Sequence, residues 1–259
     1  MTPWHSLAGK KIWVTGGAGY LGSVIVRALN AEGADVVCMD LPGRAAALVK
    51  EHALSRTVPL DVDLTNAEAA PALVAATIEK YGVPDGVAHL AIPPSSGLRL
   101  ADLTVAGFQR VLDLSLPPTF AFCRALADRM QPRGSGSIVL FSSMYGVVAP
   151  DSSIYHAPMA PNPIEYGACK AAVLQLARYF AAHYGPHGIR FNCITPGPFP
   201  KTSIQNANPA FIAALSQKTV LNRIGQNNEI VGPTLFLLTD GASFVTGQSL
   251  AVDGGWTIR

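Results

Sequence analysis

The chain has little charge. Asp, Glu, Lys and Arg make up 14% of its 259 residues, and the formal net charge at pH 7 is +2. Its nineteen Lys and Arg are scattered instead of gathered in runs. Proteins that bind nucleic acid or an anionic membrane present a basic patch, so the composition argues against both partners. With 49% apolar residues, we expect a globular chain with a large core.

Long apolar runs and paired cysteines are also missing. No run approaches the roughly 18 apolar residues that cross a bilayer. The first six residues do not form a signal-peptide pattern. The four cysteines are widely spaced with no C-x-x-C pair, which indicates reduced, packed thiols in a cytoplasmic protein. They are Cys38, Cys123, Cys169 and Cys193.

Spacings typical of a metal site are absent from the sequence as well. His183 and His187 lie four positions apart, but Gly185-Pro186 breaks the helix between them. No other metal-ligand spacing appears, and we expect no metal.

What the sequence does contain is an alternation of strand and helix patterns over the whole chain. The expected strands are 11–14, 35–39, 57–60, 86–90, 137–142, 190–195 and 249–252. The expected helices are 21–32, 66–81, 107–130, 164–183 and 228–238. Such alternation predicts the α/β class, with a doubly wound parallel seven-stranded sheet covered on both faces. No composition shift marks a second domain, so we expect one Rossmann domain over residues 1–259.

A glycine-rich turn follows the first expected strand. Gly17-x-Gly19-x-x-Gly22 lies between a strand and a helix, which is the context that the dinucleotide fingerprint requires. Glycines permit a tight turn and close approach of backbone to pyrophosphate, and the helix N-terminus offers free N–H groups. We therefore expect a nicotinamide dinucleotide here.

Asp40 ends the second expected strand, 18 residues after Gly22. A carboxylate there accepts hydrogen bonds from the ribose 2′-hydroxyl and repels a 2′-phosphate, which favours NAD(H) over NADP(H). Arg44 is the competing signal, because a guanidinium close by admits the phosphate. An aspartate that is merely solvated in a turn is the other alternative.

Tyr166 and Lys170 lie four apart on the expected helix 164–183, so their side chains project from one face. A nearby ammonium favours phenolate and lowers the pKa of a tyrosine, which makes it usable in proton transfer. The alternative is an ordinary surface lysine beside an interfacial tyrosine. Ser142 and Ser143 end an apolar strand, where ligands of open α/β sheets lie.

Strand-end serine followed by Tyr-x-x-x-Lys resembles the short-chain dehydrogenase/reductase family. Other segments match it too: Asn192-x-Ile194-x-Pro196-Gly197 resembles the segment beside nicotinamide, and Val252-Asp253-Gly254-Gly255 resembles the closing motif. The resemblance implies that Ser143, Tyr166, Lys170 and Ser115 are catalytic. It also implies a set of cofactor contacts: Gly16, Gly17, Gly19, Tyr20, Leu21, Gly22, Asp40, Asp63, Leu64, Ala91, Tyr166, Lys170, Pro196 and Gly197.

Four departures from the family pattern stand out. Gly19 is spaced as in the family's longer, epimerase-like branch, with Tyr20 where compact members have glycine. His89-Leu90-Ala91-Ile92 replaces Asn-Asn-Ala-Gly, and we interpret His89 as a packed, hydrogen-bonded residue beside the cofactor instead of a ligand or acid. Ser115 replaces the relay asparagine, so we expect a relay built differently. Ser143 and Tyr166 lie 23 apart because of an insertion within residues 146–165.

The resemblance implies hydride transfer between nicotinamide and a secondary alcohol or ketone, in which Tyr166 moves the proton and Ser143 binds the substrate oxygen. We expect residues 198–222 to form a lid and residues 146–165 a second wall of the substrate site. Polar residues in that wall favour a hydroxylated substrate such as a sugar derivative, while a steroid or fatty-acyl substrate stays open. An epimerase or dehydratase and a non-catalytic nucleotide sensor are the alternative functions.

Two expected helices are apolar on more than one face. Residues 164–183 carry three charges (Glu165, Lys170 and Arg178), and residues 107–130 have Phe120 and Phe122 in addition to a core face. A helix that is apolar all round needs a second covering surface. The resemblance implies a homo-oligomer, a tetramer or dimer, formed through these helices.

Overall fold

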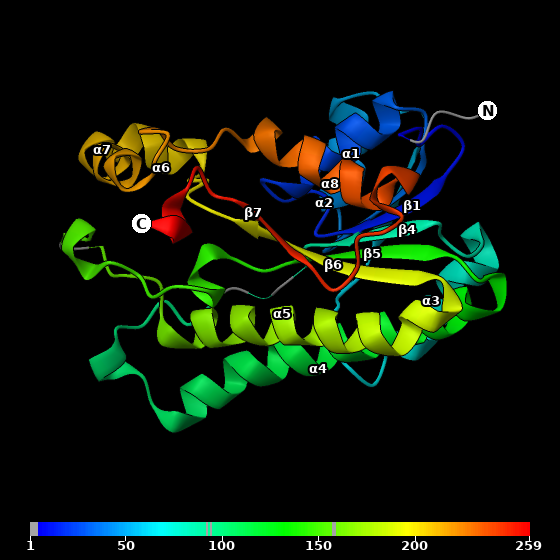
Figure 1. The fold of residues 1–259 in the computed structure, drawn as a ribbon, viewed down its shortest axis with the longest axis horizontal. Coiled ribbons are helices and arrows are strands. Elements are labelled where there is room, and N and C mark those ends of the chain that lie inside the picture. The colour runs from blue at the N-terminus through cyan, green and yellow to red at the C-terminus, as the bar shows by residue number, and fades with distance from the viewer. Residues whose placement is uncertain (1–4, 92, 94, 157–158) are drawn as a thin grey trace.

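The computed structural model describes residues 5–91, 93, 95–156 and 159–259. The first four residues, Ile92 and Pro94 of the segment after strand four, and residues 157–158 of the insertion lie outside this description. The chain forms one seven-stranded sheet with all strands parallel, in the order β3-β2-β1-β4-β5-β6-β7 (Figure 1). The strands are β1 Lys11–Thr15, β2 Asp35–Asp40, β3 Thr57–Asp61, β4 Gly86–His89, β5 Gly136–Phe141, β6 Ile189–Pro196 and β7 Ser249–Val252. The predicted doubly wound sheet is therefore confirmed.

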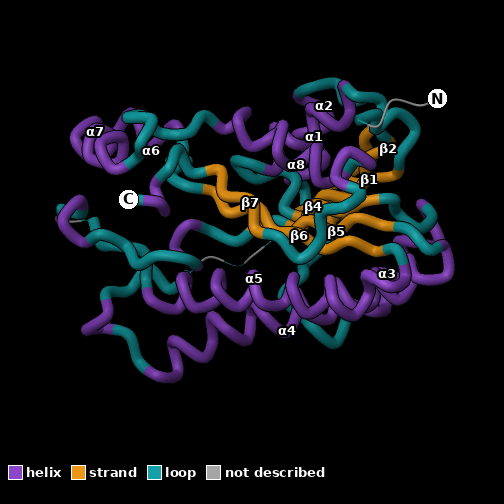
Figure 2. The backbone as a smooth tube through the Cα atoms, in the orientation of Figure 1, coloured by secondary structure: helices purple, strands orange, loops and turns teal. Residues whose placement is uncertain are grey.

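Two layers of helices sandwich this sheet (Figure 2). The helices are α1 Gly22–Ala31, α2 Arg44–Glu51, α3 Ala70–Tyr81, α4 Val105–Met130, α5 Ile164–Tyr184, α6 Thr202–Ala207, α7 Pro209–Lys218 and α8 Val231–Leu238. Helices α3, α4 and α5 cover one face, and α1, α2 and α8 cover the other. No helix among the described residues is long and apolar enough to cross a membrane.

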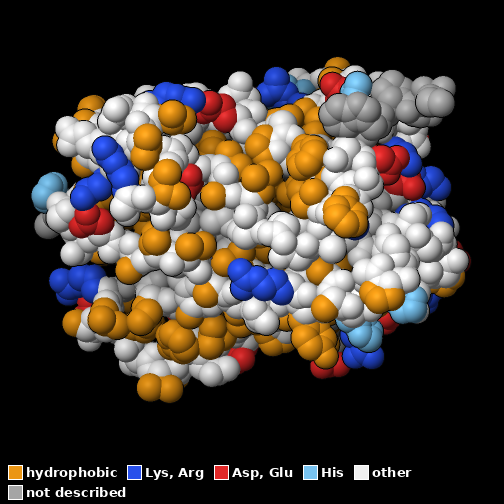
Figure 3. Space-filling view, viewed as in Figure 1, with side chains coloured by type: hydrophobic (Ala, Val, Ile, Leu, Met, Phe, Trp, Pro, Cys, Tyr) orange, Lys and Arg blue, Asp and Glu red, His pale blue; other side chains and the backbone are white. Residues whose placement is uncertain are grey.

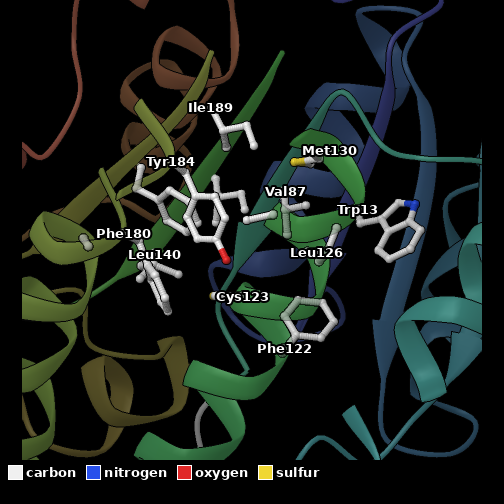
Figure 4. Packing of buried hydrophobic residues seen from close by; sticks show 14 of the residues in the cluster. Trp13, Val87, Phe122, Cys123, Leu126, Met130, Leu140, Phe180, Tyr184 and Ile189 are labelled. Atoms are coloured by element: carbon white, nitrogen blue, oxygen red, sulfur yellow. The ribbon is translucent and has the colours of Figure 1, made fainter. Parts of the chain in front are cut away.

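Alternate residues of each strand feed the two cores, because successive strand side chains point to opposite faces. In β1, Trp13 packs with Phe122 and Leu126 of α4 in the first core, which Figure 4 shows from close by. Its neighbours Ile12 and Val14 pack in the second core against α1 and α8. Since both faces are buried, the strands read as continuous apolar runs, which explains why the sequence predicted them well.

Three segments differ from the sequence-based expectation. Helix α2 was not predicted: it has eight residues and buries Ala45 and Leu48, too few to give a helical pattern. The helix expected from residue 66 begins at Ala70, because Asn66 accepts hydrogen bonds from the next turn's backbone and so forms a turn ahead of the helix. The expected lid, residues 198–222, contains the helices α6 and α7.

A third, smaller core lies beyond the carboxyl ends of the strands. It joins residues from the turn after β5, the insertion, helix α7, the segment after it and the C-terminus: Met144, Tyr145, Ile154, Leu215, Ile224 and Trp256. Figure 1 shows α6, α7 and the C-terminus at this end of the molecule. The segments expected to form the substrate site therefore have a hydrophobic core of their own.

Candidate functional site

The glycine turn between β1 and α1 leaves no room for side chains at two positions. A Cβ on Gly22 would come within 2.1 Å of the Gly16 carbonyl oxygen. Gly16 has φ +65°, and a Cβ there would lie 3.0 Å from the Ala91 backbone nitrogen. This tight backbone places the N–H groups at the start of α1 beside the cavities described next, as a bound pyrophosphate requires.

A cavity of about 310 Å³ opens beside this turn. It lies at the carboxyl ends of β1, β2, β3 and β4 and against α4. Predicted cofactor residues among its lining are Gly16, Gly19, Asp40, Asp63, Leu64 and Ala91. Its lining of apolar side chains with a carboxylate at one end suits an adenosine moiety.

Asp40 is held firmly at the end of β2. Its carboxylate accepts hydrogen bonds from the backbone nitrogens of Ala18 at 2.8 Å and Leu41 at 2.9 Å. Arg44 pairs with it at 2.9 Å from the first turn of α2. The Asp40 side chain is buried, while that of Arg44 is half exposed. Asp40 is therefore a fixed part of the cavity wall, and Arg44 is the movable partner.

A second cavity, of about 300 Å³, adjoins the first, and both are lined by Gly16, Gly19 and Leu90. It gathers predicted residues from the glycine turn, β5, α5 and β6. They are Gly16, Gly19, Tyr20, Leu21, Gly22, Ser143, Tyr166, Lys170, Pro196 and Gly197. Two connected cavities around one glycine turn fit the two halves of a dinucleotide, so the residues present suit a nicotinamide cofactor.

The two strand-end serines have different surroundings. Both line the second cavity, but the Ser142 hydroxyl is engaged with the backbone, because it donates to the Lys170 carbonyl oxygen at 2.7 Å. The Ser143 hydroxyl accepts a hydrogen bond from the Tyr145 backbone nitrogen at 3.2 Å, and it acts on the Tyr166 hydroxyl to lower the pKa of that phenol. Ser143 is thus the serine whose hydroxyl acts on the tyrosine.

Lys170 lies behind Tyr166, with its Nζ 5.5 Å from the centroid of the phenol ring. The ammonium donates to the Phe141 carbonyl oxygen at 2.9 Å. Burial lowers the pKa of Lys170 to about 8. The lysine is therefore charged through most of the neutral range, and it loses its proton far more readily than a solvated lysine does.

The prediction that the pKa of Tyr166 is lowered is wrong for this structure. Burial raises the pKa of Tyr166, and its hydrogen bond with Ser143 offsets part of that rise. The Lys170 ammonium is engaged with a carbonyl oxygen of β5 and does not reverse the effect of burial. Desolvation of the phenolate is the larger effect here.

Ser115 lies on α4, in the lining of the first cavity and not of the second. Its hydroxyl is buried and has no hydrogen-bond partner of ordinary geometry among the described residues. Burial raises the pKa of the Cys169 thiol, which precedes Lys170, and the Ser115 hydroxyl offsets part of that rise. A buried hydroxyl without a partner is a natural binding point for a water molecule.

His89 is packed in the core beside the cavities, as interpreted from the sequence. Its two ring nitrogens lie 2.9 Å from the Thr15 hydroxyl and 3.3 Å from the Thr119 hydroxyl. The ring stacks on Phe122 with centroids 5.2 Å apart. Burial and the charge of Lys170 lower the pKa of His89 to about 4. Thr15 also accepts a hydrogen bond from the Ala91 backbone nitrogen at 3.2 Å, so this network fixes the segment that lines the cofactor cavity.

Sequence reasoning missed Glu165, which is completely buried beside Tyr166. One carboxylate oxygen accepts hydrogen bonds from the backbone nitrogen and hydroxyl of Ser96, which ties the segment after β4 to the first turn of α5. A lone acid before an apolar helix is the signal that sequence alone offered. Phe199, which lines the second cavity, gave no signal of its own. Among the described residues, no three His, Cys, Asp or Glu side chains gather as a metal site.

The chain is similar to known proteins over almost its whole length. The family model described as Enoyl-(Acyl carrier protein) reductase matches residues 17–257. A 2,5-dichloro-2,5-cyclohexadiene-1,4-diol dehydrogenase of Sphingobium indicum is 35% identical over 255 residues, which cover 97% of this chain and 98% of that protein. A short-chain dehydrogenase of Leptospira borgpetersenii with bound NAD+ superposes with a TM-score of 0.83 at 28% identity, over 99% of this chain and 96% of that one. A gluconate 5-dehydrogenase of Burkholderia cenocepacia, in complex with NADP and tartrate, superposes with a TM-score of 0.86 at 26% identity, over 99% and 98%.

Proposed function

This chain belongs to the short-chain dehydrogenase/reductase family and is a dehydrogenase of CH–OH groups, and we propose that Ser143, Tyr166 and Lys170 carry out its reaction. The reaction interconverts a secondary alcohol and a ketone. The observation that carries this assignment is that the three side chains line one cavity, which adjoins the glycine turn. A bound nicotinamide dinucleotide supplies the hydride acceptor or donor.

Tyr166 exchanges a proton with the substrate oxygen in this scheme. In alcohol oxidation its phenolate takes the hydroxyl proton, and in ketone reduction its phenol returns one. Ser143 donates a hydrogen bond to the same oxygen and stabilises charge that develops there. Lys170, charged at neutral pH because its pKa is about 8, favours the phenolate and holds the ribose hydroxyls of the cofactor.

Ser115 completes the proton path in the proposal. Its buried hydroxyl lacks a partner of ordinary geometry among the described residues, which suits a bound water that links Lys170 to solvent. Ser115→Ala removes that binding point. The relay role predicts a severalfold lower kcat, with NADH binding unchanged; an unchanged kcat would exclude Ser115 from the relay.

NAD(H) is the proposed cofactor in preference to NADP(H). Asp40 supports this preference, because its fixed carboxylate lies where the adenosine ribose is expected. Solved relatives carry NAD+ in one case and NADP in another, so the comparisons support a nicotinamide dinucleotide of either kind. Arg44 acts in the opposite direction, because its guanidinium beside Asp40 favours a 2′-phosphate.

A hydroxylated substrate is the proposed class, with a sugar derivative as its main example. Two relatives have names or bound molecules of this kind: the dichlorocyclohexadiene diol dehydrogenase and the gluconate 5-dehydrogenase with tartrate. The most direct test is a panel of secondary alcohols and ketones, including sugar ketones, followed by NADH absorbance. Turnover of at least one member that is lost in Tyr166→Phe supports the function, and equal turnover in the variant rejects it.

A homo-oligomer, tetrameric or dimeric, is proposed to form through α4 and α5. Apolar side chains gather along the edge of the molecule that these helices form (Figure 3). Phe120 is 43% exposed and Tyr179 is 69% exposed. They border a depression of about 580 Å³, whose lining also includes Leu116, Pro117, Ala172, Gln175 and Leu176. An apolar face of this kind favours burial against a second copy.

We also propose a cytoplasmic location. All four cysteines are free and buried in the structure. Burial raises the pKa of Cys38 to about 12, which keeps its thiol protonated and unreactive. Unpaired thiols are typical of a reducing compartment. Fractionation of cells that express the tagged chain would test this location.

A further inference from the structure

The insertion between Ser143 and Tyr166 makes three contacts that the proposed hydride transfer does not use. Two of them join the insertion to helix α7 of the lid. The Tyr155 ring lies 5.3 Å from the Phe211 ring, centroid to centroid, at a 48° tilt. Lys218 pairs with Asp151 at 2.5 Å. The lid helix is therefore attached to the insertion by an aromatic contact at one end and an ion pair at the other.

The third contact joins the insertion to the turn after β5. The hydroxyls of Tyr145 and Tyr155 lie 2.7 Å apart. Burial raises the pKa of both phenols, so each keeps its proton and the pair is a neutral hydrogen bond. Tyr145 is buried in the third core with Leu215 of α7. Tyr155 consequently touches the lid with its ring and the turn after β5 with its hydroxyl.

Tyr145 is in turn fixed against the proposed catalytic residues. Its backbone nitrogen donates to the Ser143 hydroxyl at 3.2 Å. Its carbonyl oxygen is so close to α5 that a Cβ on Gly167 would lie 2.8 Å from it. One residue later, a Cβ on Gly146 would lie 2.7 Å from the Lys170 carbonyl carbon. The turn Met144–Gly146 is thus seated on the same helix that carries Tyr166 and Lys170.

We propose that Tyr155 is a positioning residue that couples the docked lid to Ser143. The path runs from Phe211 on the lid, through the Tyr155 ring and hydroxyl, to Tyr145 and then to the Ser143 hydroxyl. The ion pair between Asp151 and Lys218 holds α7 in the position in which Phe211 contacts Tyr155. The insertion thus holds the lid in place. The Ser143 hydroxyl, which binds the substrate oxygen, is correctly positioned only when the lid is docked. This inference rests on the proposed function for the role of Ser143.

Tyr155→Phe is the main test, because it keeps the ring on Phe211 and removes the hydroxyl. A hydrogen bond of this kind contributes about 1 kcal/mol, so we expect kcat to fall about fivefold. KM for the alcohol and the Kd of NADH should stay unchanged, because the lid contact and the cofactor cavity are intact. Phe211→Ala should act differently: it frees the lid, raises KM and lowers kcat together.

The ion pair gives a second test that needs no turnover. Limited trypsin digestion at Lys201, ahead of α6, reports how firmly the lid is docked. An exposed ion pair is a weak contact, so Asp151→Asn should speed this cleavage only about two- to fivefold. The charge-swapped double variant Asp151→Lys with Lys218→Asp should restore the wild-type rate.

The matched control is Asp35→Asn, which breaks an exposed ion pair with Arg56 at 2.7 Å, at the amino end of β2 far from the lid. It should change neither cleavage nor kcat. The coupling is overturned if Tyr155→Phe leaves kcat unchanged, and the docking is overturned if the charge swap fails to restore slow cleavage. If the wild type turns over no alcohol or ketone, the proposed function fails, and the digestion still decides whether the insertion docks the lid.

Discussion

Replacement of Asp40 by Asn should reverse the choice between NADH and NADPH. The substitution keeps the shape of a side chain that is almost completely buried and removes its charge. The amide oxygen still accepts from the Ala18 backbone nitrogen, and the local bond from the Leu41 nitrogen of the next residue is the one that is lost. The local fold should therefore survive, and the change should act on the cofactor.

The expected size follows from the contacts of Asp40. A charge-assisted hydrogen bond to a ribose hydroxyl contributes about 1.5–3 kcal/mol, so kcat/KM with NADH should fall roughly 10- to 100-fold. A carboxylate about 4 Å from a phosphate charge is repelled by about 4 kcal/mol at an effective dielectric constant of 20. Arg44, at 2.9 Å, already compensates part of that charge, so we expect kcat/KM with NADPH to rise about tenfold. The selectivity ratio then changes by about two to three orders of magnitude.

The assay is ketone reduction at a saturating ketone concentration, with NADH or NADPH varied. Asp61→Asn is the matched control: Asp61 is the register partner of Asp40 on β3, and its carboxylate accepts from the Gly43 backbone nitrogen. The control removes a carboxylate charge from the neighbouring strand β3. It should leave the ratio of kcat/KM with NADH to kcat/KM with NADPH nearly unchanged. A wild type that prefers NADPH, or equal shifts in both variants, would refute the reasoning.

Three further predictions concern the proposed active site and the apolar face. Tyr166→Phe should lower kcat at least about a hundredfold, as loss of a general acid–base does, with the Kd of NADH from fluorescence titration nearly intact; a retained kcat would contradict the role of the phenol. Alcohol oxidation should speed up as pH rises from 7 toward about 8, because the raised pKa of Tyr166 leaves little phenolate at pH 7, whereas ketone reduction should decline over the same range and beyond it, because a deprotonated Lys170 no longer passes a proton to Tyr166 through the proposed relay. Opposite slopes in the two kcat/KM profiles check this, and parallel profiles would contradict it. Tyr179→Asp should convert the wild-type oligomer to a smaller species in light scattering, because it places a charge on the exposed apolar face of α5; a wild type that is already monomeric would exclude that interface.

The sheet was predictable because each strand is a short apolar run bounded by polar or glycine residues. Both faces of the sheet are covered, so burial of the strands left a strong trace in the sequence. The eight-residue helix α2 left none, because only two of its residues reach the core. Helices α6 and α7 were hidden for a similar reason: α6 buries no residue, and the buried Leu215 of α7 packs in the third core instead of on the sheet.

At the site, the residue types could be predicted from the sequence, whereas their burial and contacts could not. Spacing placed Tyr166 and Lys170 on one face, and the structure brings both to the cavity of Ser143. The direction of the Tyr166 pKa could not be read from spacing, because burial outweighs the neighbouring charge. The hydrogen bonds of His89 join residues 30 and 74 positions away, and no local pattern reports them.

The burial of His89 and the nearby charge of Lys170 also determine how the fold responds to acid. An unfolded histidine takes up a proton near pH 6.5, whereas this buried ring resists it until about pH 4. Between these pH values the unfolded chain binds more protons than the folded chain, so the free energy of unfolding decreases as the pH falls. The total decrease that His89 causes is about 3 kcal/mol. The ring joins Thr15 at the end of β1 to Thr119 of α4, so acidification weakens the fold at the wall of the first cavity and not at its surface.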